Sequence, residues 1–215
     1  MKILELFAGS RSVGKVAEEL GHEVFSVDIE NFDNIDLTID IEKLTPDMIP
    51  FKPEMIWASI PCTSYTIAAI SKHRDNVVPK SKFALKSDRL SIKTLELIKY
   101  YDCIYFIENP RGMFRKMPFI QDSPRVTVSY CQYGDIRMKP TDIFTNALNY
   151  WTPRPMCKNY KYDKEGNIID QHCHHESARR GSPTGTQGLK NNYERSKIPR
   201  DLILEIIISL KGVKE

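Results

Sequence analysis

The chain has 215 residues, a formal net charge of +3 and 41% hydrophobic residues. This length and composition suit one large domain, or a domain with a small insert, and they exclude wholesale disorder. The mild positive charge permits a nucleic-acid partner without requiring one. The five cysteines are odd in number and irregularly spaced, which argues against a disulfide framework and for a reducing compartment. With no signal-peptide pattern and no apolar run of membrane-spanning length, the chain is expected to be cytoplasmic.

The N-terminal sequence predicts a strand, a turn, a helix and a second strand. Residues 3–7 form a short apolar run, small residues follow at 8–10, and apolar positions then recur at helical spacing as far as Gly21. Residues 23–27 predict the second strand, which ends on Asp28. A small-residue turn with an acid about 20 residues later is typical of a nucleoside-binding βαβ unit, in which the acid accepts hydrogen bonds from ribose hydroxyls.

Two positions near this unit bear on the ligand. Arg11 stands where a second glycine is expected, which disfavours a phosphate-rich dinucleotide, and a purely structural turn is the alternative. Asp40 and Ile41 follow a weakly alternating stretch and are well placed to meet an adenine, the acid at its amino group and the isoleucine on its face. The alternative for Asp40 is a cap of the following turn, a position that Asp often takes.

A cysteine follows the predicted central strand of the sheet. Residues 54–59 are a short apolar run preceded by prolines, the pattern of a buried strand in a parallel sheet, and Pro61 and Cys62 come soon after it. In open α/β sheets the carboxyl ends of the strands face the ligand, so this position presents a thiol to a substrate. The alternative is that Cys62 acts only as a small buried hydrophobic residue.

The next segment is polar and basic over residues 67–86. We expect a long loop there, suited to covering a polyanion, with an ordinary solvated surface as the alternative. Ser87 or Asp88 is expected to cap the helix that follows, whose apolar side includes Leu90 and Leu97.

Residues 103–107 predict a further strand, and it ends in Glu108, Asn109 and Pro110. If this strand lies beside the one before Cys62, its terminal carboxylate meets the same substrate.

Residues 125–130 and 142–145 predict a final pair of strands. Between them, Arg137 and Lys139 stand at alternate positions, which places both cations on one face of an extended segment.

Residues 151–192 are polar and carry several glycines and prolines, which predicts an insert with little core of its own. Its cysteines and histidines allow two interpretations, a zinc staple or a polar surface loop. The candidate zinc ligands are Cys157, His172, Cys173 and His175. No CxxC pair is present, and adjacent ligands suit one tetrahedron poorly. Apolar residues at helical spacing after Pro199 predict a last helix that covers the sheet.

Taken in chain order, these segments resemble the motifs of the DNA (cytosine-5)-methyltransferase family. The specific part is a Pro-Cys nucleophile motif at Cys62 followed by a Glu-Asn motif at Glu108, after which the family usually has valine and this chain has Pro110. The weaker matches are the cofactor loop at 7–10, the ribose-binding acid at 28–29, the adenine contact at 40–41, a helix start at 88–90, a reduced Gln-Arg-Arg motif at Arg137 and Lys139, and the last motif at 196–199.

The resemblance implies a Rossmann-like, S-adenosylmethionine-dependent methyltransferase fold of the α/β class, with a mostly parallel sheet covered by helices on both faces. It implies a catalytic core at residues 1–150, a reduced target-recognition region at 151–192 and a C-terminal helix at 193–215 that packs back on the core. It also implies the cofactor S-adenosyl-L-methionine, bound by Phe7, Ala8, Gly9, Ser10, Asp28, Ile29, Asp40, Ile41, Pro61 and Leu90.

The family's reaction gives each candidate catalytic residue a role. Cytosine C5 is not nucleophilic enough to take a methyl group unaided, so Cys62 would add to C6 of a cytosine flipped out of DNA. Glu108 would form hydrogen bonds with N3 and with the exocyclic amine. Arg137 and Lys139 would hold the pyrimidine carbonyl or a backbone phosphate and favour the thiolate.

Two departures from the family matter, namely Arg11 in the cofactor loop and the compressed recognition region. Few side chains are then available to read bases, so recognition should be short or assisted by an accessory partner. The compact form is similar to phage-type members, which implies a DNA-associated enzyme in the cytoplasm of a bacterial or phage-infected cell, of the kind used in restriction and modification. Two alternatives stay open: an RNA cytosine-5 methyltransferase, and a non-catalytic DNA-binding accessory protein.

Overall fold

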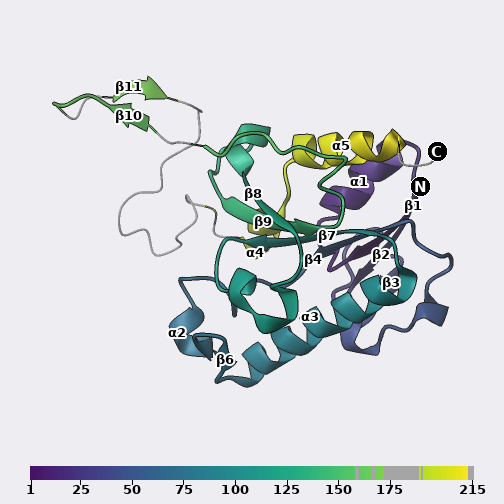
Figure 1. Ribbon diagram of the computed structural model, residues 1–215. Coiled ribbons are helices and arrows are strands. Elements are labelled where there is room, and N and C mark those ends of the chain that lie inside the picture. The colour runs from purple at the N-terminus through teal and green to yellow at the C-terminus, as the bar shows by residue number, and fades with distance from the viewer. Residues whose placement is uncertain (158–159, 166–167, 172–188, 190, 213–215) are drawn as a thin grey trace.

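The computed structural model describes residues 1–157, 160–165, 168–171, 189 and 191–212 (Figure 1). Its centre is a seven-stranded sheet in the order β3-β2-β1-β4-β7-β9-β8. Pairing is parallel from β3 through to β7, whereas β9 is antiparallel to both β7 and β8. The strands are β1 (Lys2–Leu6), β2 (Glu23–Asp28), β3 (Leu37–Thr38), β4 (Met55–Ser59), β7 (Ile104–Pro110), β8 (Arg125–Ser129) and β9 (Pro140–Thr145). The mostly parallel sheet expected from the sequence is confirmed.

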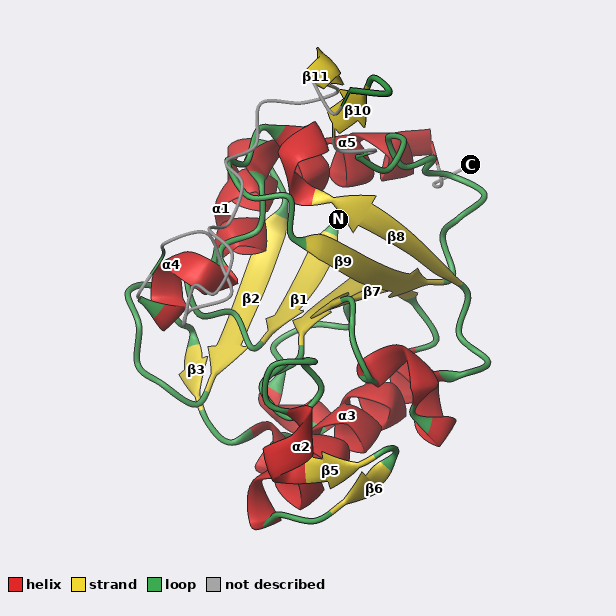
Figure 2. Ribbon diagram, turned by 90° about the vertical axis from the view of Figure 1, so that its left-hand side faces the viewer, coloured by secondary structure: helices red, strands yellow, loops and turns green. Residues whose placement is uncertain are grey.

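Helices cover both faces of this sheet. α1 (Ser12–Glu19) and α5 (Arg200–Ser209) lie together on one face, and α3 (Lys82–Tyr101) lies on the other (Figures 1 and 2). The C-terminal helix therefore does pack back on the core, beside the first helix of the chain. This arrangement confirms the predicted Rossmann-like fold.

The strands are apolar at nearly every position because they are buried on both sides. In β4, Met55 and Trp57 point into the core under α1 and α5, and Ile56 and Ala58 point into the core under α3. All four side chains have 0% exposure. A continuous apolar run of strand length is thus the expected signature of a central parallel strand.

The helix after the basic segment starts earlier than the sequence indicated. α3 begins at Lys82 with Ser81 as its cap, and the Ser81 hydroxyl oxygen accepts from the Ala84 amide at 3.1 Å. Ser87 is inside the helix and donates to the Phe83 carbonyl instead. The expected cap at Ser87 or Asp88 is therefore wrong, because residues that follow Ser81 are good helix formers despite their charge.

The expected long loop at residues 67–86 is also wrong, since most of it has short elements of its own. They are α2 (Ile70–His73), β5 (Arg74–Asp75) and β6 (Val78–Pro79), where β5 and β6 form a small antiparallel hairpin. Arg74 is fully buried and explains why this segment has a defined structure. It donates to the Ser64 carbonyl and forms an ion pair with Asp88 on α3. The loop that follows Cys62 is thereby tied to the helix beneath it.

The remaining elements are short. In the insert, β10 (Tyr160–Tyr162) and β11 (Ile168–Gln171) pair antiparallel, and α4 (Asn192–Ser196) precedes α5. The 3-10 helices are Ile41–Lys43, Pro46–Met48, Phe114–Lys116, Pro118–Ile120, Tyr130–Tyr133 and Leu210–Gly212. Of the helices that the structure describes, none has the length and apolar character needed to cross a membrane.

Three of the four zinc candidates, His172, Cys173 and His175, lie outside the described residues. Cys157 is buried, and its amide donates to the Ser129 hydroxyl at 3.1 Å. Among the residues that are described, no three His, Cys, Asp or Glu side chains form a group that could hold a metal ion.

Candidate functional site

The candidate nucleophile and the candidate carboxylate lie at the carboxyl ends of two adjacent parallel strands. β4 and β7 pair with Ser59 opposite Glu108, and Cys62 follows in the loop that leaves β4. Asn109 is fully buried and donates from Nδ2 to the Ile60 carbonyl oxygen at 3.0 Å. This hydrogen bond ties the Pro-Cys loop to β7, so the thiol and the carboxylate share one edge of the sheet.

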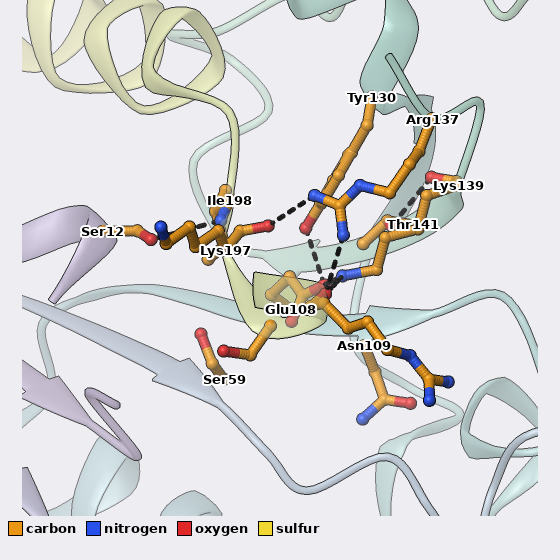
Figure 3. Close-up of polar contacts among 12 residues, drawn as sticks. Ser12, Ser59, Glu108, Asn109, Tyr130, Arg137, Lys139, Thr141, Lys197 and Ile198 are labelled. Atoms are coloured by element: carbon orange, nitrogen blue, oxygen red, sulfur yellow. Dashed lines mark hydrogen bonds and ion pairs between the residues drawn. The ribbon is translucent and has the colours of Figure 1, made fainter. Parts of the chain in front are cut away.

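Glu108 is buried, and two side chains contact the same one of its oxygens (Figure 3). The Tyr130 hydroxyl donates to Oε1 at 2.7 Å, and the Lys139 ammonium lies 3.8 Å from Oε1. Burial raises the pKa of Tyr130 well above its ordinary value, and the charge of Glu108 raises it further. Tyr130 is therefore a neutral donor that fixes the orientation of the carboxylate.

The Cys62 thiol has opposing charges around it. Burial raises the pKa of Cys62 above its ordinary value, and the negative charge of Glu108 raises it further. The positive charges of Lys139 and Arg195 act in the opposite direction. The thiol is thus protonated in the free protein, and anything that neutralises Glu108 favours the thiolate that a nucleophilic attack requires.

Arg137 has no donor left for a substrate. Its Nε and one terminal nitrogen bond to Asp135, and the terminal nitrogens also donate to the carbonyl oxygens of Glu194, Arg195 and Lys197. A guanidinium has five N–H donors, and these contacts use all of them. The arginine instead fixes the chain that leads into the last helix.

Lys139 is the cation that reaches the carboxylate. Its φ of 25° lies in the left-handed region that side chains with a Cβ rarely adopt, which is the kind of strain found at functional sites. Its ammonium lies 4.6 Å from the centre of the Tyr130 ring, and Arg137 packs over the same ring at 6.0 Å. The expected extended segment is wrong, because Arg137 lies in a bend and Lys139 has a positive φ, but both cations still lie over the Tyr130 ring and only Lys139 faces Glu108.

The expected cofactor loop lies at the carboxyl end of β1, between that strand and α1. Phe7, Gly9 and Arg11 all have positive φ values, of 57°, 47° and 53°. The Gly9 amide donates to Asp28 Oδ2 at 2.9 Å, and Asp28 Oδ1 accepts from the Glu30 amide at 2.9 Å. The acid at the end of β2 therefore shapes the loop.

The other expected cofactor contacts differ in their exposure. Ala8 and Ser10 are buried in the loop, with the Ala8 amide bonded to the Val27 carbonyl, and Pro61 is partly exposed in the loop after β4. Ile29 is 55% exposed beside Asp28, whereas Ile41 and Leu90 are buried in the core under α3. Of these aliphatic side chains, Ile29 has the most surface free for a ligand.

Asp40 takes the capping position that was the alternative to an adenine contact. Its Oδ1 accepts from the Glu42 amide at 3.2 Å, and its Oδ2 accepts from the Lys86 ammonium at 2.6 Å. The pKa of Asp40 is lowered, chiefly by the hydrogen bond from Lys86. No sequence pattern indicated the contact with Lys86, which comes from α3 and competes for the same carboxylate.

Arg11 leaves the cofactor loop free because its side chain turns inward. It is buried, donates from Nε to the Ser26 hydroxyl at 2.9 Å and pairs with Glu18. Gly14 is required beside it, because a Cβ there would lie 2.7 Å from Glu5 Oε2 and 3.0 Å from Arg11. The departure at Arg11 therefore affects the packing of α1 on the sheet, not the surface that a cofactor would touch.

These residues fit the nucleoside part of S-adenosyl-L-methionine. A carboxylate has about four acceptor positions, so Asp28 can still accept from ribose hydroxyls after its two amide contacts. The exposed side chain of Ile29 offers an aliphatic surface for an adenine ring. The donor and acceptor set at the ends of β1 and β2 is thus suitable for that cofactor.

Tyr130 is the functional candidate that the sequence analysis missed. It is the last residue of the strand predicted at 125–130 and follows β8 directly, so it was counted only as part of a strand. A tyrosine at a strand end is a weak signal by itself. Its contact with Glu108 depends on the antiparallel placement of β9 between β7 and β8.

Comparisons with known proteins agree with this architecture. No family model matches the chain. A protein of Frog virus 3 (isolate Goorha), described as a probable DNA (cytosine-5)-methyltransferase, is 28% identical over 221 aligned residues, which cover 96% of this chain and 99% of the relative.

A solved structure also shows the same fold, and a second one is similar in part. A protein encoded within an E. coli prophage and taken to be a DNA modification methyltransferase matches with a TM-score of 0.51 and 13% identity, over 73% of this chain and 51% of that chain. A Spodoptera frugiperda DNMT2 mutant matches with a TM-score of 0.45 and 21% identity, over 71% of this chain and 53% of that chain. This chain therefore spans about half the length of either solved protein.

The viral relative confirms the resemblance that the Cys62 and Glu108 motifs predicted, and the prophage structure confirms the fold. The chain is therefore similar over nearly its whole length to a probable DNA (cytosine-5)-methyltransferase, and it shares the fold of the prophage methyltransferase.

Proposed function

We propose that this chain transfers a methyl group from S-adenosyl-L-methionine to C5 of a cytosine in DNA, through a covalent bond between Cys62 and C6. The observation that carries the proposal is the pairing of β4 with β7, which brings the Cys62 thiol and the Glu108 carboxylate to one edge of the sheet. The choice of DNA rests on the name of the Frog virus 3 relative.

Cys62 acts as the nucleophile. Its thiolate forms a bond to C6 and pushes the C5–C6 π electrons toward C5, which then has the electron pair needed to form a new carbon–carbon bond. Bound S-adenosyl-L-methionine supplies the methyl group. When water takes the C5 proton, its bonding pair restores the C5–C6 double bond, the C6–S bond breaks and the thiolate returns to Cys62.

Glu108 binds and activates the base. Tyr130 and Lys139 both contact Oε1, so we assign Oε2 to N3 and the exocyclic amine of the cytosine. A proton held between Glu108 and N3 lets the ring accept the electrons that the thiolate donates. It also removes the negative charge that raises the pKa of Cys62.

The two cations have different roles in this proposal. Lys139 offsets the charge of Glu108 and favours the Cys62 thiolate. Arg137 is a positioning residue, because its guanidinium is committed to Asp135 and to backbone carbonyls. The target base must leave the duplex to reach this buried edge, as base-modifying enzymes require, and the short insert favours a brief recognition sequence or an accessory partner.

The test is methyl transfer from tritiated S-adenosyl-L-methionine to duplex DNA and to RNA in parallel, with Cys62→Ser as the inactive control. Label in DNA, at C5 of cytosine after nuclease digestion, supports the proposal. Label in RNA alone would support the same reaction with RNA, not DNA, as the substrate. No transfer to any DNA by a folded protein that binds the cofactor would overturn the proposal.

A further inference from the structure

A segment near the C-terminus joins the two halves of the site. We refer to residues 191–198 as the C-terminal strap; it contains α4 and leads into α5. At the cofactor end, the Ile198 amide donates to the Ser12 hydroxyl at 3.2 Å (Figure 3), and the Tyr193 ring lies 5.7 Å from that of Phe32. On the side that faces Glu108, the strap contacts Arg137, which donates a hydrogen bond of 3.2 Å to the Lys197 carbonyl.

Within the strap, the backbone of Arg195 is held beside the carboxylate. Its carbonyl oxygen accepts from Arg137 at 3.0 Å and from the Lys139 ammonium at 3.2 Å. The same ammonium lies 3.8 Å from Glu108 Oε1. The Lys139 ammonium therefore bridges the Arg195 backbone and Glu108, the candidate base-binding residue. The two charged donors, Arg137 and Lys139, fix the position of the Arg195 backbone and so of the base of its side chain.

The Arg195 side chain is partly buried and close enough to Cys62 for its charge to lower the pKa of the thiol. Within the described part of the chain, its guanidinium has no hydrogen bond or ion pair. The contrast with Arg137 is informative, since every donor of that arginine is used. A partly buried guanidinium at the edge of a reaction site, with no partner among the described residues, can offer its five donors to a ligand.

We propose that Arg195 contacts the target nucleotide and takes the place that the sequence motif gave to Arg137. This inference rests on the proposed function. The ligand is a negatively charged oxygen of that nucleotide, either the pyrimidine O2 as it gains charge during thiolate addition or a phosphate oxygen beside the flipped base. The planar guanidinium can bind either oxygen, but the two contacts affect different measured quantities. An O2 contact acts on rate, and a phosphate contact acts on DNA affinity.

The experiment compares Arg195→Ala and Arg195→Lys with Arg200→Ala. Arg200 is a matched control because it is exposed, lies close by in sequence and pairs with Glu19 on α1. Each protein is assayed for S-adenosyl-L-methionine affinity by calorimetry, for DNA affinity across a series of salt concentrations, and for the single-turnover rate of adduct formation with saturating 5-fluorocytosine duplex. Adduct formation by the unmodified protein must be seen first, and its absence would count against the proposed function itself.

For an O2 contact, Arg195→Ala slows adduct formation about 10- to 100-fold at saturating DNA, with unchanged salt dependence. For a phosphate contact, it weakens DNA binding and lowers the slope of log affinity against log salt by about 0.9, and Arg195→Lys restores that slope. In either case Arg200→Ala matches the unmodified protein. Arg195→Ala behaving like Arg200→Ala in both rate and DNA affinity would overturn the inference. So would a loss confined to S-adenosyl-L-methionine binding, or equal loss of folding in both Arg195 variants.

Discussion

The Tyr130 hydroxyl donates a hydrogen bond of 2.7 Å to Glu108 Oε1, and it does so from a fully buried position. Tyr130 follows β8, which is two strands away from β7 in the sheet. The bond therefore links the antiparallel edge of the sheet to the residue that we assign to the cytosine. Because Tyr130 stays neutral, it can donate to the carboxylate at any working pH.

Tyr130→Phe should slow methyl transfer about 10-fold without changing the affinity for S-adenosyl-L-methionine. The substitution removes one hydrogen bond to a charged group, worth about 1.5–3 kcal/mol, and leaves Glu108 less well oriented. Single-turnover kinetics and calorimetry measure the two effects. Tyr133→Phe is the matched control, since its hydroxyl accepts from the Arg154 amide at 2.8 Å, away from Glu108. Equal rates for the two variants would contradict the role given to Tyr130.

Glu108→Gln should keep cofactor binding and lose most of the methyl-transfer rate, because a neutral amide cannot hold the proton that activates N3. The same change removes a negative charge that raises the pKa of Cys62. Alkylation of Cys62 by iodoacetamide should therefore become faster at a fixed pH near neutrality, even as catalysis fails. Slower alkylation in this variant would show that Glu108 does not act on the thiol.

The sequence was enough to locate β1, β2, β4 and β7 to within a few residues, because buried parallel strands are largely apolar runs of strand length. It also predicted that Cys62 and Glu108 share one edge of the sheet, since the ends of adjacent parallel strands meet there. It could not separate Arg137 from Lys139. Both are cations at alternate positions, and only the contacts with residues 194–197 show that Arg137 is fully used.

Charge patterns were misleading in the basic segment. Residues 67–86 look like an exposed loop, yet Arg74 is buried there and pairs with Asp88. A buried arginine is recognisable only when its partners are known, and here they include Ser64 in the loop after β4 and Asp88 on α3. For the same reason Lys86 could not be matched to Asp40, which is 46 residues away in the chain.

Arg74→Met should destabilise the fold by about 3–5 kcal/mol, because it leaves the Asp88 carboxylate without its buried cation. The Arg74→Met/Asp88→Asn double variant should be more stable than the single variant, since no unpaired charge remains. Urea unfolding followed by circular dichroism gives both values. A double variant that is less stable than Arg74→Met would mean that the pair is not the reason for the loss.

Glu5 should make stability depend on pH. Burial raises the pKa of Glu5 to about 7 from an ordinary value of 4.5, although Ser26 and Arg11 act in the opposite direction. The folded state then binds more protons than the unfolded state between these two values. The free energy of unfolding should therefore fall by roughly 3 kcal/mol as the pH rises from about 4.5 to about 7, and should level off above that.

Glu5→Gln provides the control for this effect, because it keeps the shape of the side chain and cannot titrate. Its unfolding free energy should lack the part of the pH dependence that Glu5 contributes. Unfolding of both proteins by urea at several pH values between 4 and 8 measures the difference. If the two curves run parallel, the Glu5 carboxyl is not buried as described.

The most direct test of the account is whether Cys62 forms the covalent bond to the base. With duplex DNA that carries 5-fluorocytosine at the target position, C5 has no proton to lose after methyl transfer, so the C6–S bond cannot break. The protein should form an adduct that resists denaturation, that needs S-adenosyl-L-methionine, and that maps to Cys62 by mass spectrometry. Cys62→Ser should form none while it still binds the cofactor. An adduct that persists in Cys62→Ser, or that maps to another cysteine, would contradict the assignment of the nucleophile.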